Sequence, residues 1–513
     1  MKKKINIFLS MSLMFIIVFL GVILLAIFQN WTFSLIFLGV YAASILFTIV
    51  IIRNKSRRFE TRLRWSIFII AVPFVGMASY ILFGRSYKYK TDNEYRYKNF
   101  SEFATSHDRE TSRHALETLA KESPQYKRAF VLGNNLQNDT IYDQTNTKLL
   151  DNGADFVVSL FRDIKKAEKY ILLNFYVIKD GELLDNLVAL LKSKAAQGVN
   201  IYIIYDFTGC YTDFKYETQT KLQEAGIRLV PFAPLNLPWI NWTANYRDHR
   251  KDVSIDGKIG YIGGINLSDE YINMSSKFGF WNDAHVRIAG AAVQGIEKIF
   301  ASDWNFCHRQ QERITDLEPS VGTLHSIENY SNDLTQIVSS GPNHNTPMHF
   351  DLMMSLVNSA QKRIWISSPY FVPPVELINA LCTAAKSGID VKLVIPGKTD
   401  KKLLLEVSKR WTRQLFEAGV RIYSMNNTFN HTKAYLFDDN IAFIGSTNLD
   451  FRAFFSDQQT MALIKSETFN KELETRFLWD FSKSFEYTFL PNDELPTGKK
   501  VLVAMFNIIS PLL

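Results

Sequence analysis

Two stretches of the chain carry the same polar residues in the same order. One begins at His249 with HRKDVSIDGKIGYIGGIN, and the other begins at His431 with HTKAYLFDDNIAFIGSTN. In each stretch the Lys follows the His by two positions, the Asp follows the Lys by five, and an Asn closes a turn of small residues. Every member of the second set lies 182 positions after its counterpart. A repeat in register predicts one fold used twice, with the polar sets at equivalent places.

These residue types suit the cleavage of a phosphodiester. His and Lys alternate, so on a strand both side chains point to one face. If the two halves meet, their lysines and asparagines would bind the non-bridging oxygens and offset the charge of the transition state. One imidazole would attack phosphorus while the other protonates the leaving oxygen. Because the lysine pair supplies the positive charge, we expect no metal and no cofactor. The predicted site comprises His249, Lys251, Asp256, His431, Lys433 and Asp438 as the catalytic set, with Asn266, Asn448, Gly264 and Ser446 as its phosphate-binding support.

The aspartates of the two motifs, Asp256 and Asp438, differ in position from the other members of the set. Each lies beyond its Lys, further along the same strand. We therefore expect them to brace the site rather than to touch the substrate.

Further matches extend the repeat beyond the polar stretches. AEKYILLNFYVIKD at Ala167 is similar to AQKRIWISSPYFVP at Ala360, and LQEAGIRLVPF (222–232) is similar to LFEAGVRIYSM (415–425). The matches combine helix ends and Gly turns with apolar runs, which indicates helices alternating with buried strands. We predict an α/β fold of two pseudo-symmetric halves, 126–320 and 321–495. Mixed or parallel sheets flanked by helices would enclose one shared site.

The N-terminal region is typical of membrane insertion. No charged residue occurs from Ile5 to Ile52, which leaves room for two helices of about 20 residues. A third uncharged stretch contains Pro73, which would kink it. The apolar run is too long for a signal peptide. We predict a membrane region at 1–84 with helices at about 5–28, 32–52 and 65–84.

Basic residues near the N-terminus and at 53–64 favour the cytoplasm for those segments. Three full spans would place the remaining body outside, and a re-entrant third segment would keep it inside. We further predict a polar connector at 85–125 and an interfacial tail at 496–513. The tail has too few apolar residues to span, and Lys499 and Lys500 suit anionic headgroups. A tail packed on the core is the alternative.

The two HxKx₄D motifs resemble those of the phospholipase D superfamily. Within it, the chain is similar over nearly its whole length to bacterial cardiolipin synthases, through NYRDHRKDVSIDGKIGYIGGINLSDEY, FWNDAHVRIAG, DWNF, SSPYFVP and the closing SPLL. The resemblance implies transfer of a phosphatidyl group from one phosphatidylglycerol to another, giving cardiolipin and glycerol through a phosphohistidine. It also implies a multi-pass protein of the bacterial cell membrane whose partners are phosphatidylglycerol and other membrane lipids, not nucleic acid. Whether the protein is a homodimer stays open.

One position departs from the family pattern. The His of the second motif is usually oriented by a Glu about 28 residues on, where this chain has Gln459. In the first half the corresponding carboxylate is expected to be Asp283, so His249 would keep an anionic partner and His431 would have a neutral amide. Asp457 is a substitute if the strand shifts. The superfamily usually places the nucleophile in the first motif, so the resemblance implies His249 as the nucleophile, with Asp283 stabilising its positive charge, and His431 as the acid and then the base.

Three other functions remain as alternatives. A membrane-bound phospholipase D would hydrolyse the lipid to phosphatidic acid, and a membrane-anchored nuclease would act on another phosphodiester. The membrane helices and the absence of a dense basic, aromatic-laced groove argue against the nuclease. A catalytically inactive scaffold is the third alternative, and intact His and Lys in both motifs argue against it.

Overall fold

The computed structural model describes residues 31–54, 58–84, 106–137, 139–234, 246–275, 277–308, 331, 333–344, 346–488, 498 and 503. These residues belong to two compact units. The described part of the smaller unit lies within Met1–Tyr87, and the larger unit comprises Lys88–Asn236 and Tyr246–Asn507.

Three helices form the described part of the smaller unit. They are α2 (Trp31–Arg53), α3 (Phe59–Ala71) and α4 (Pro73–Phe83). Within α2, Leu35–Arg53 is the one segment among the described residues that is long and apolar enough to cross a membrane, with a mean hydropathy of 2.7. This helix matches the predicted span at 32–52, and the predicted span at 5–28 lies outside the described residues.

The predicted helix at 65–84 consists of two helices, α3 and α4, and it is interrupted where Pro73 was expected to kink it. The helical conformation is interrupted at Val72, whose φ of −137° and ψ of 78° are not helical. Pro73 explains the break, because a proline disfavours the helical conformation in the residue before it. A Cβ on Gly76 would lie 2.6 Å from the Cα of Ile69, so the glycine permits close packing of α4 on α3. Each piece is shorter than the roughly 20 residues that a spanning helix needs.

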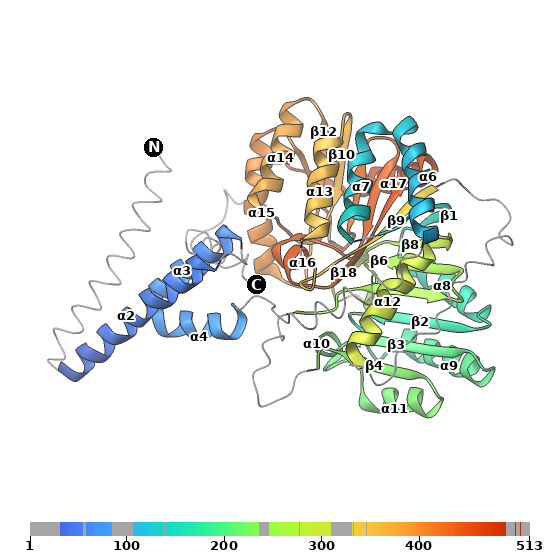
Figure 1. Ribbon diagram of the computed structural model, residues 1–513, viewed down its shortest axis with the longest axis horizontal. Helices are drawn as coiled ribbons and strands as arrows, with labels where there is room; N and C mark the ends of the chain where they lie inside the picture. Colours follow the sequence, from blue (N-terminus) through green and yellow to red (C-terminus); the bar gives the residue numbers. More distant parts are fainter. Residues whose placement is uncertain are drawn as a thin grey trace. The chain divides into compact units, whose positions relative to one another are not determined.

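One 15-stranded sheet runs through the larger unit (Figure 1). Its strands, in spatial order, are β19 (Ser484–Glu486), β13 (Arg421–Met425), β12 (Asp390–Pro396), β10 (Arg363–Ser367), β15 (Ala434–Phe437), β16 (Ile441–Gly445), β18 (Gln459–Lys465), β9 (Asp333–Ser340), β1 (Ile141–Leu150), β8 (His285–Gly290), β6 (Ile259–Gly263), β5 (Lys251–Ile255), β2 (Tyr170–Phe175), β3 (Asn200–Asp206) and β4 (Arg228–Phe232). Two small parallel pairs accompany it, β11 (Phe371–Val372) with β17 (Leu449–Asp450) and β14 (Thr428–Asn430) with β7 (Phe280–Asn282).

The sheet is symmetric about the antiparallel pair β1 and β9. Outward from β1 run β8, β6, β5, β2, β3 and β4, and outward from β9 run β18, β16, β15, β10, β12 and β13. Starting from β1 or from β9, each series has four antiparallel pairings and then two parallel ones. The prediction of two repeated α/β halves is confirmed.

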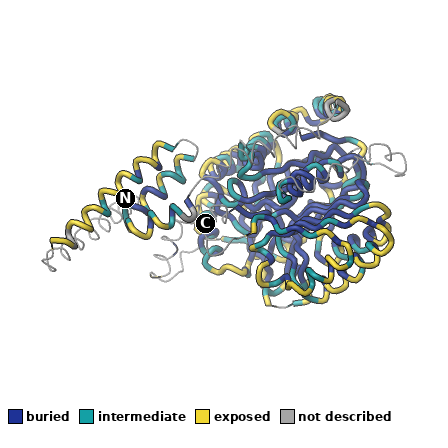
Figure 2. Tube along the Cα trace, turned by 60° about the horizontal axis from the view of Figure 1, so that its bottom comes forward, coloured by how far each residue is buried: buried dark blue, intermediate teal, exposed yellow. Residues whose placement is uncertain are grey.

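Helices cover both faces of the sheet. The helices and 3₁₀ turns of the larger unit are α6 (Ser106–Glu122), η1 (Pro124–Tyr126), α7 (Lys127–Gln137), α8 (Gly153–Lys165), α9 (Glu182–Ala196), α10 (Phe207–Cys210), α11 (Tyr216–Glu224), η2 (Asp269–Ile272), α12 (Val293–His308), α13 (Met348–Ser359), α14 (Val375–Lys386), α15 (Lys402–Glu417), α16 (Phe451–Phe455) and α17 (Glu467–Ser482). Side chains of α12 and α17 share one buried cluster with the central strands. Figure 2 shows the buried sheet with exposed residues on the outer helices.

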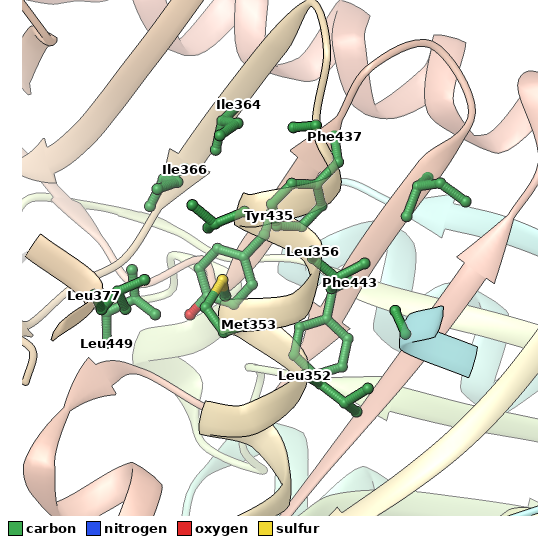
Figure 3. Packing of buried hydrophobic residues seen from close by; sticks show 14 of the residues in the cluster. Leu352, Met353, Leu356, Ile364, Ile366, Leu377, Tyr435, Phe437, Phe443 and Leu449 are labelled. Carbon is green, nitrogen blue, oxygen red and sulfur yellow. The ribbon is translucent and has the colours of Figure 1, made fainter. Parts of the chain in front are cut away.

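Figure 3 shows how a helix covers the sheet in the second half. The side chains of Leu352, Met353 and Leu356 on α13 face Tyr435 of β15 and Phe443 of β16. The spacing of three to four residues places them on one side of the helix. Each such buried side chain stabilises the fold by about 1.5–3 kcal/mol, so this packing fixes the strand that follows the second motif.

The connector helices belong to the second half. Tyr126, Ala129 and Phe130, together with Ala115 and Leu119 of α6, lie in the same buried cluster as the second-half strands. The predicted start of the first half at residue 126 is therefore too early, because apolar faces of η1 and α7 are buried on the other half. In the predicted C-terminal tail only Gly498 and Val503 are described, and Val503 is buried against Val372 and Val407.

Candidate active site

Each motif histidine lies two or three residues before a strand, His249 before β5 and His431 before β15, where the two halves meet. The N–H of His249 donates to the carbonyl of Gln458 (2.9 Å), and the N–H of His431 donates to the carbonyl of Asn282 (2.7 Å). The flanking residues pair in parallel, Asp248 with Gln458 and Asn430 with Asn282. The histidine of each half is therefore hydrogen-bonded to the backbone of the other half.

This exchange decides which side chain orients which imidazole. Nδ1 of His249 lies 3.2 Å from Oε1 of Gln459, and Nδ1 of His431 lies 2.6 Å from Oδ2 of Asp283. The expected pairing of His249 with Asp283 and of His431 with Gln459 is wrong. The physical reason lies in the backbone pairing between the halves. Gln459 directly follows Gln458, which pairs with the first motif, and Asp283 directly follows Asn282, which pairs with the second. Each imidazole is therefore oriented by a side chain of the other half.

Asp457 does not replace the missing carboxylate at either histidine. It forms an ion pair with Arg452, with Nε and Oδ2 3.0 Å apart. Burial raises the pKa of Asp457, and the Arg452 charge opposes this rise. His249 is therefore left with a neutral partner, and His431 has the anionic one.

The two motif lysines are fully buried beside the histidines. Nζ of Lys251 donates to the carbonyl of His249 (2.7 Å) and lies 5.0 Å from the ring centre of Tyr176. Nζ of Lys433 lies 2.6 Å from Nδ1 of His431 and 3.8 Å from Oδ2 of Asp283, and it also donates to the carbonyl of His431.

Burial lowers the pKa of all four basic groups. The pKa values of His249 and Lys251 fall well below their usual values, that of His431 falls to about 4, and that of Lys433 falls to about 8. The charges of both lysines further lower the pKa of each histidine, so the four groups act on one another within one site. For Asp283, burial raises the pKa, but Lys433 and His431 outweigh it and hold the value below normal. The free site thus has neutral imidazoles, and a bound phosphate anion would favour the charged forms of the buried lysines.

The small residues after each motif hold the supporting side chains. A Cβ on Gly264 would lie 2.1 Å from Oδ1 of Asp283, so the carboxylate occupies the space that a side chain would take. Oγ of Ser446 donates to Oε1 of Gln459 (2.6 Å) and accepts from the N–H of Thr460 (3.0 Å). Both residues therefore act on the histidine partners, whereas the sequence indicated phosphate contact.

The two asparagines have unlike surroundings. Oδ1 of Asn266 accepts from the N–H of Val177 (3.0 Å), and its Nδ2 donates to the hydroxyl of Tyr271 (2.6 Å). Asn448 is also buried, but its Oδ1 has no hydrogen-bond partner among the described residues. The symmetric phosphate clamp expected from the sequence is therefore not symmetric in the structure.

Asp256 and Asp438 lie at the far ends of β5 and β15, about 17 Å along the strand from the lysine for five residues. Asp256 accepts from the backbone N–H groups of 168, 169 and 170 at 2.8–2.9 Å. Asp438 accepts from those of 361, 362 and 363, and from the hydroxyl of Tyr126 (2.7 Å). These two aspartates brace the segments that lead into β2 and β10, as expected. They do not belong to the catalytic set in which the sequence pattern had placed them.

Replacing Asp438 with Asn is expected to destabilise the protein without removing a group from the site. Asn tolerates the positive φ of 51°, but its amide cannot accept as many of the four donors. We expect a loss of about 2 kcal/mol, measured as a Tm lowered by several degrees. Asp439→Ala is the matched control, because the neighbouring side chain is 56% exposed. Equal Tm values for the two variants would contradict the bracing role.

The sequence alone did not predict that aromatic side chains would surround the two histidines. The ring of Tyr176 lies 4.7 Å from that of His249, and the rings of Tyr271 and Trp281 lie 5.6 and 5.2 Å from that of His431. Tyr176 lies in the quoted repeat and Trp281 in the quoted FWNDAH segment, but aromatic residues there are equally typical of a core. Only the spatial arrangement assigns them to the site.

Comparisons with known proteins identify the family of this chain. The family described as "Cardiolipin synthase, PLD-like domain" matches residues 160–304 and 353–481, and "Phospholipase_D-nuclease N-terminal" matches residues 42–85. The cardiolipin synthase of Halalkalibacterium halodurans is 32% identical over 94% of this chain and 95% of its own. That of Alkalihalophilus pseudofirmus is 30% identical over 100% of both chains.

A solved structure shows the same fold. The phosphatidylserine synthase of Haemophilus influenzae has a TM-score of 0.57 and 15% identity, and the match covers 76% of this chain and 100% of that one. Together with the sequence relatives and the paired His and Lys residues, these matches confirm the family resemblance. The chain belongs to the cardiolipin synthase family of phospholipase D-like proteins.

Proposed function

We propose that this chain transfers a phosphatidyl group from one phosphatidylglycerol to another, giving cardiolipin and glycerol. The observation that carries the proposal is the single site built from both motifs, in which each histidine is oriented by a residue of the other half. The cardiolipin synthases that match almost the whole chain support the same product.

The proposed reaction has two steps that use the same groups in reverse. Nε2 of His249 attacks phosphorus, the bond from phosphorus to the glycerol oxygen breaks, and His431 gives its proton to that oxygen. A hydroxyl of the second phosphatidylglycerol then gives its proton to His431 and attacks phosphorus, and the P–N bond breaks. Lys251 and Lys433 would hold the non-bridging oxygens through both steps.

The partners of the histidines support this division of roles. A nucleophile must be neutral, and burial and both lysines keep His249 in that form, because they outweigh the opposing effect of the hydrogen bond to the neutral amide of Gln459. An acid must hold a proton, and the Asp283 carboxylate favours protonation of His431 once a phosphate anion reduces the effect of the lysines. Asp283 thus supports the acid, whereas the sequence had paired it with the nucleophile.

We further propose a multi-pass membrane location with access to lipid headgroups. The apolar helix α2 supports membrane insertion, and the uncharged sequence from Ile5 to Trp31 is long enough for another span. The lipid substrates require that the site reach the headgroup layer.

Purified full-length protein in detergent, given phosphatidylglycerol alone, tests the reaction. Mass spectrometry should find cardiolipin and glycerol in equal amounts. Phosphatidic acid as the only lipid product would replace the proposed transferase with a hydrolase. A His249→Ala, His431→Ala protein purified in parallel controls for a contaminating activity.

Replacing Gln459 with Glu tests the neutral partner of His249. Nε2 of Gln459 has no partner among the described residues, so an oxygen there forfeits no hydrogen bond. The new carboxylate should raise the pKa of His249, and because the nucleophile must be neutral, the acidic limb of the pH–rate profile should move up by about one pH unit. Gln459→Met, which gives no charge, is the control. A limb that moves down or stays would contradict the assignment of His249 as the nucleophile.

A further inference from the structure

The acceptor atom of Asn448 differs from that of its symmetry mate. In the first half, the equivalent oxygen of Asn266 accepts from the N–H of Val177 (3.0 Å). Oδ1 of Asn448 is buried with no partner among the described residues. A buried carbonyl without a donor costs free energy, so this atom suits a ligand hydroxyl that reaches it only during the reaction.

Tyr370 lies next to Asn448, and its hydroxyl binds a second acceptor, the carboxylate of Asp400. Parallel pairing of Phe371 with Leu449 places the preceding residues of β11 and β17 side by side. The Tyr370 hydroxyl donates to Oδ1 of Asp400 (2.8 Å), and the Asp400 side chain remains exposed. The second half thus adds a phenol and an accessible carboxylate beside the asparagine.

Tyr271 brings a donor from the first half to the same place. Its hydroxyl accepts from Nδ2 of Asn266 (2.6 Å), and a hydroxyl that accepts still carries a hydrogen that it can donate. Its ring meets that of His431 edge to face at 5.6 Å. Tyr370 packs against the cluster that contains Tyr271 and Trp281, so residues of both halves converge beside His431.

We propose that Asn448, Tyr271 and the Tyr370–Asp400 pair form a hydroxyl-binding subsite beside His431 that holds the glycerol headgroup. The subsite deepens the proposed function and rests on it. Glycerol hydroxyls both donate and accept, which matches acceptors on Asn448 and Asp400 and a donor on Tyr271. An ammonium headgroup would gain from the carboxylate alone and would face Lys433.

The position of the subsite gives it a part in both steps. His431 protonates the departing glycerol and then deprotonates the incoming one, so both glycerols pass the same histidine. Hydroxyls held there would direct the oxygen of glycerol, rather than water, to the phosphorus of the phosphatidyl enzyme. The subsite therefore favours glycerol as leaving group and as acceptor.

Asp400→Ala tests the subsite with two phosphatidyl donors in the full-length protein. One donor is phosphatidylglycerol, and the other carries p-nitrophenol, a leaving group without a glycerol. We expect glycerol release to fall about tenfold and p-nitrophenol release to change less than about twofold. The cardiolipin to phosphatidic acid ratio should also fall about tenfold. Tyr370→Phe should shift both measures in the same direction, and Asp439→Ala, at another exposed carboxylate, should shift neither.

The outcomes separate the subsite from the reaction. An equal fall with both donors, or no fall with phosphatidylglycerol, would overturn the subsite. If the wild-type protein forms phosphatidic acid alone, the transferase proposal fails, but the comparison of the two donors still tests headgroup recognition. If phosphatidylethanolamine replaces phosphatidylglycerol as the better donor in the wild type, the site reads an ammonium group and the hydroxyl assignment is overturned.

Discussion

Replacing His249 with Ala should abolish both the covalent adduct and turnover, with a loss of at least about 10⁴-fold. This imidazole forms the bond to phosphorus in the proposed reaction, and its neutral partner Gln459 lies 3.2 Å away. His431→Ala should instead slow both steps by about 10²–10⁴-fold, as expected for loss of an acid and base. A rapid neutral quench followed by mass spectrometry of the protein measures the adduct.

The donor that carries p-nitrophenol distinguishes the two variants. Its leaving group needs no protonation, so the His431→Ala protein should still form an adduct, located at position 249. His249→Ala should form none with either donor. A phosphatidyl group found on His431 in the wild-type protein would reverse the two roles and leave the overall reaction intact.

Asp283→Asn should reduce the rate of transfer by about 10⁴-fold, the loss expected when the carboxylate that orients a catalytic histidine becomes an amide. The carboxylate fixes Nδ1 of His431 at 2.6 Å and lies 3.8 Å from Nζ of Lys433. Without it, two effects combine. The imidazole loses the partner that sets its tautomer, and the pKa of His431 falls because the remaining influences, burial and Lys433, both lower it.

The sign of the pH effect follows from that change. His431 must be protonated to act as the acid, so the basic limb of the profile should move to lower pH in Asp283→Asn. Asp163→Asn is a matched control, since Asp163 is another buried carboxylate that pairs with Arg287 in the first half. Two results would contradict this prediction: activity of Asp283→Asn within about tenfold of wild type, or a basic limb of its pH–rate profile that does not move. Either would show that an amide orients His431 as well as a carboxylate does.

Much of the fold was predictable because the repeat is long and regular. The matched segments at Ala167 and Ala360 became β2 and β10, which occupy equivalent positions in the symmetric sheet. The motif lysines could be placed because His-x-Lys alternation on a strand leaves few choices. The interruption of the third membrane segment was also predictable, because Pro73 disfavours the helical conformation at Val72.

The partners of the histidines were not predictable from the repeat. Similarity between halves shows which residues are equivalent, but it does not show which half faces which. Asp283 lies closer in sequence to His249 and yet binds His431. The contact between Tyr126 and Asp438 is a similar case. The Tyr126 hydroxyl donates to the Asp438 carboxylate although the two residues are 312 positions apart in the sequence. Such contacts are set by how the halves join, and local patterns contain no signal for that.

The pairing of β1 with β9 has a consequence for how the protein could have arisen. In an isolated half, that strand would be an exposed edge with free N–H and C=O groups, a ready template for joining another chain. Since both strands pair antiparallel across an approximate two-fold axis, two copies of a single ancestral half would have associated through the same edge. Gene duplication and fusion would then have made the association permanent, and only afterwards could the copies diverge, one keeping an aspartate and the other acquiring a glutamine beside the opposite histidine.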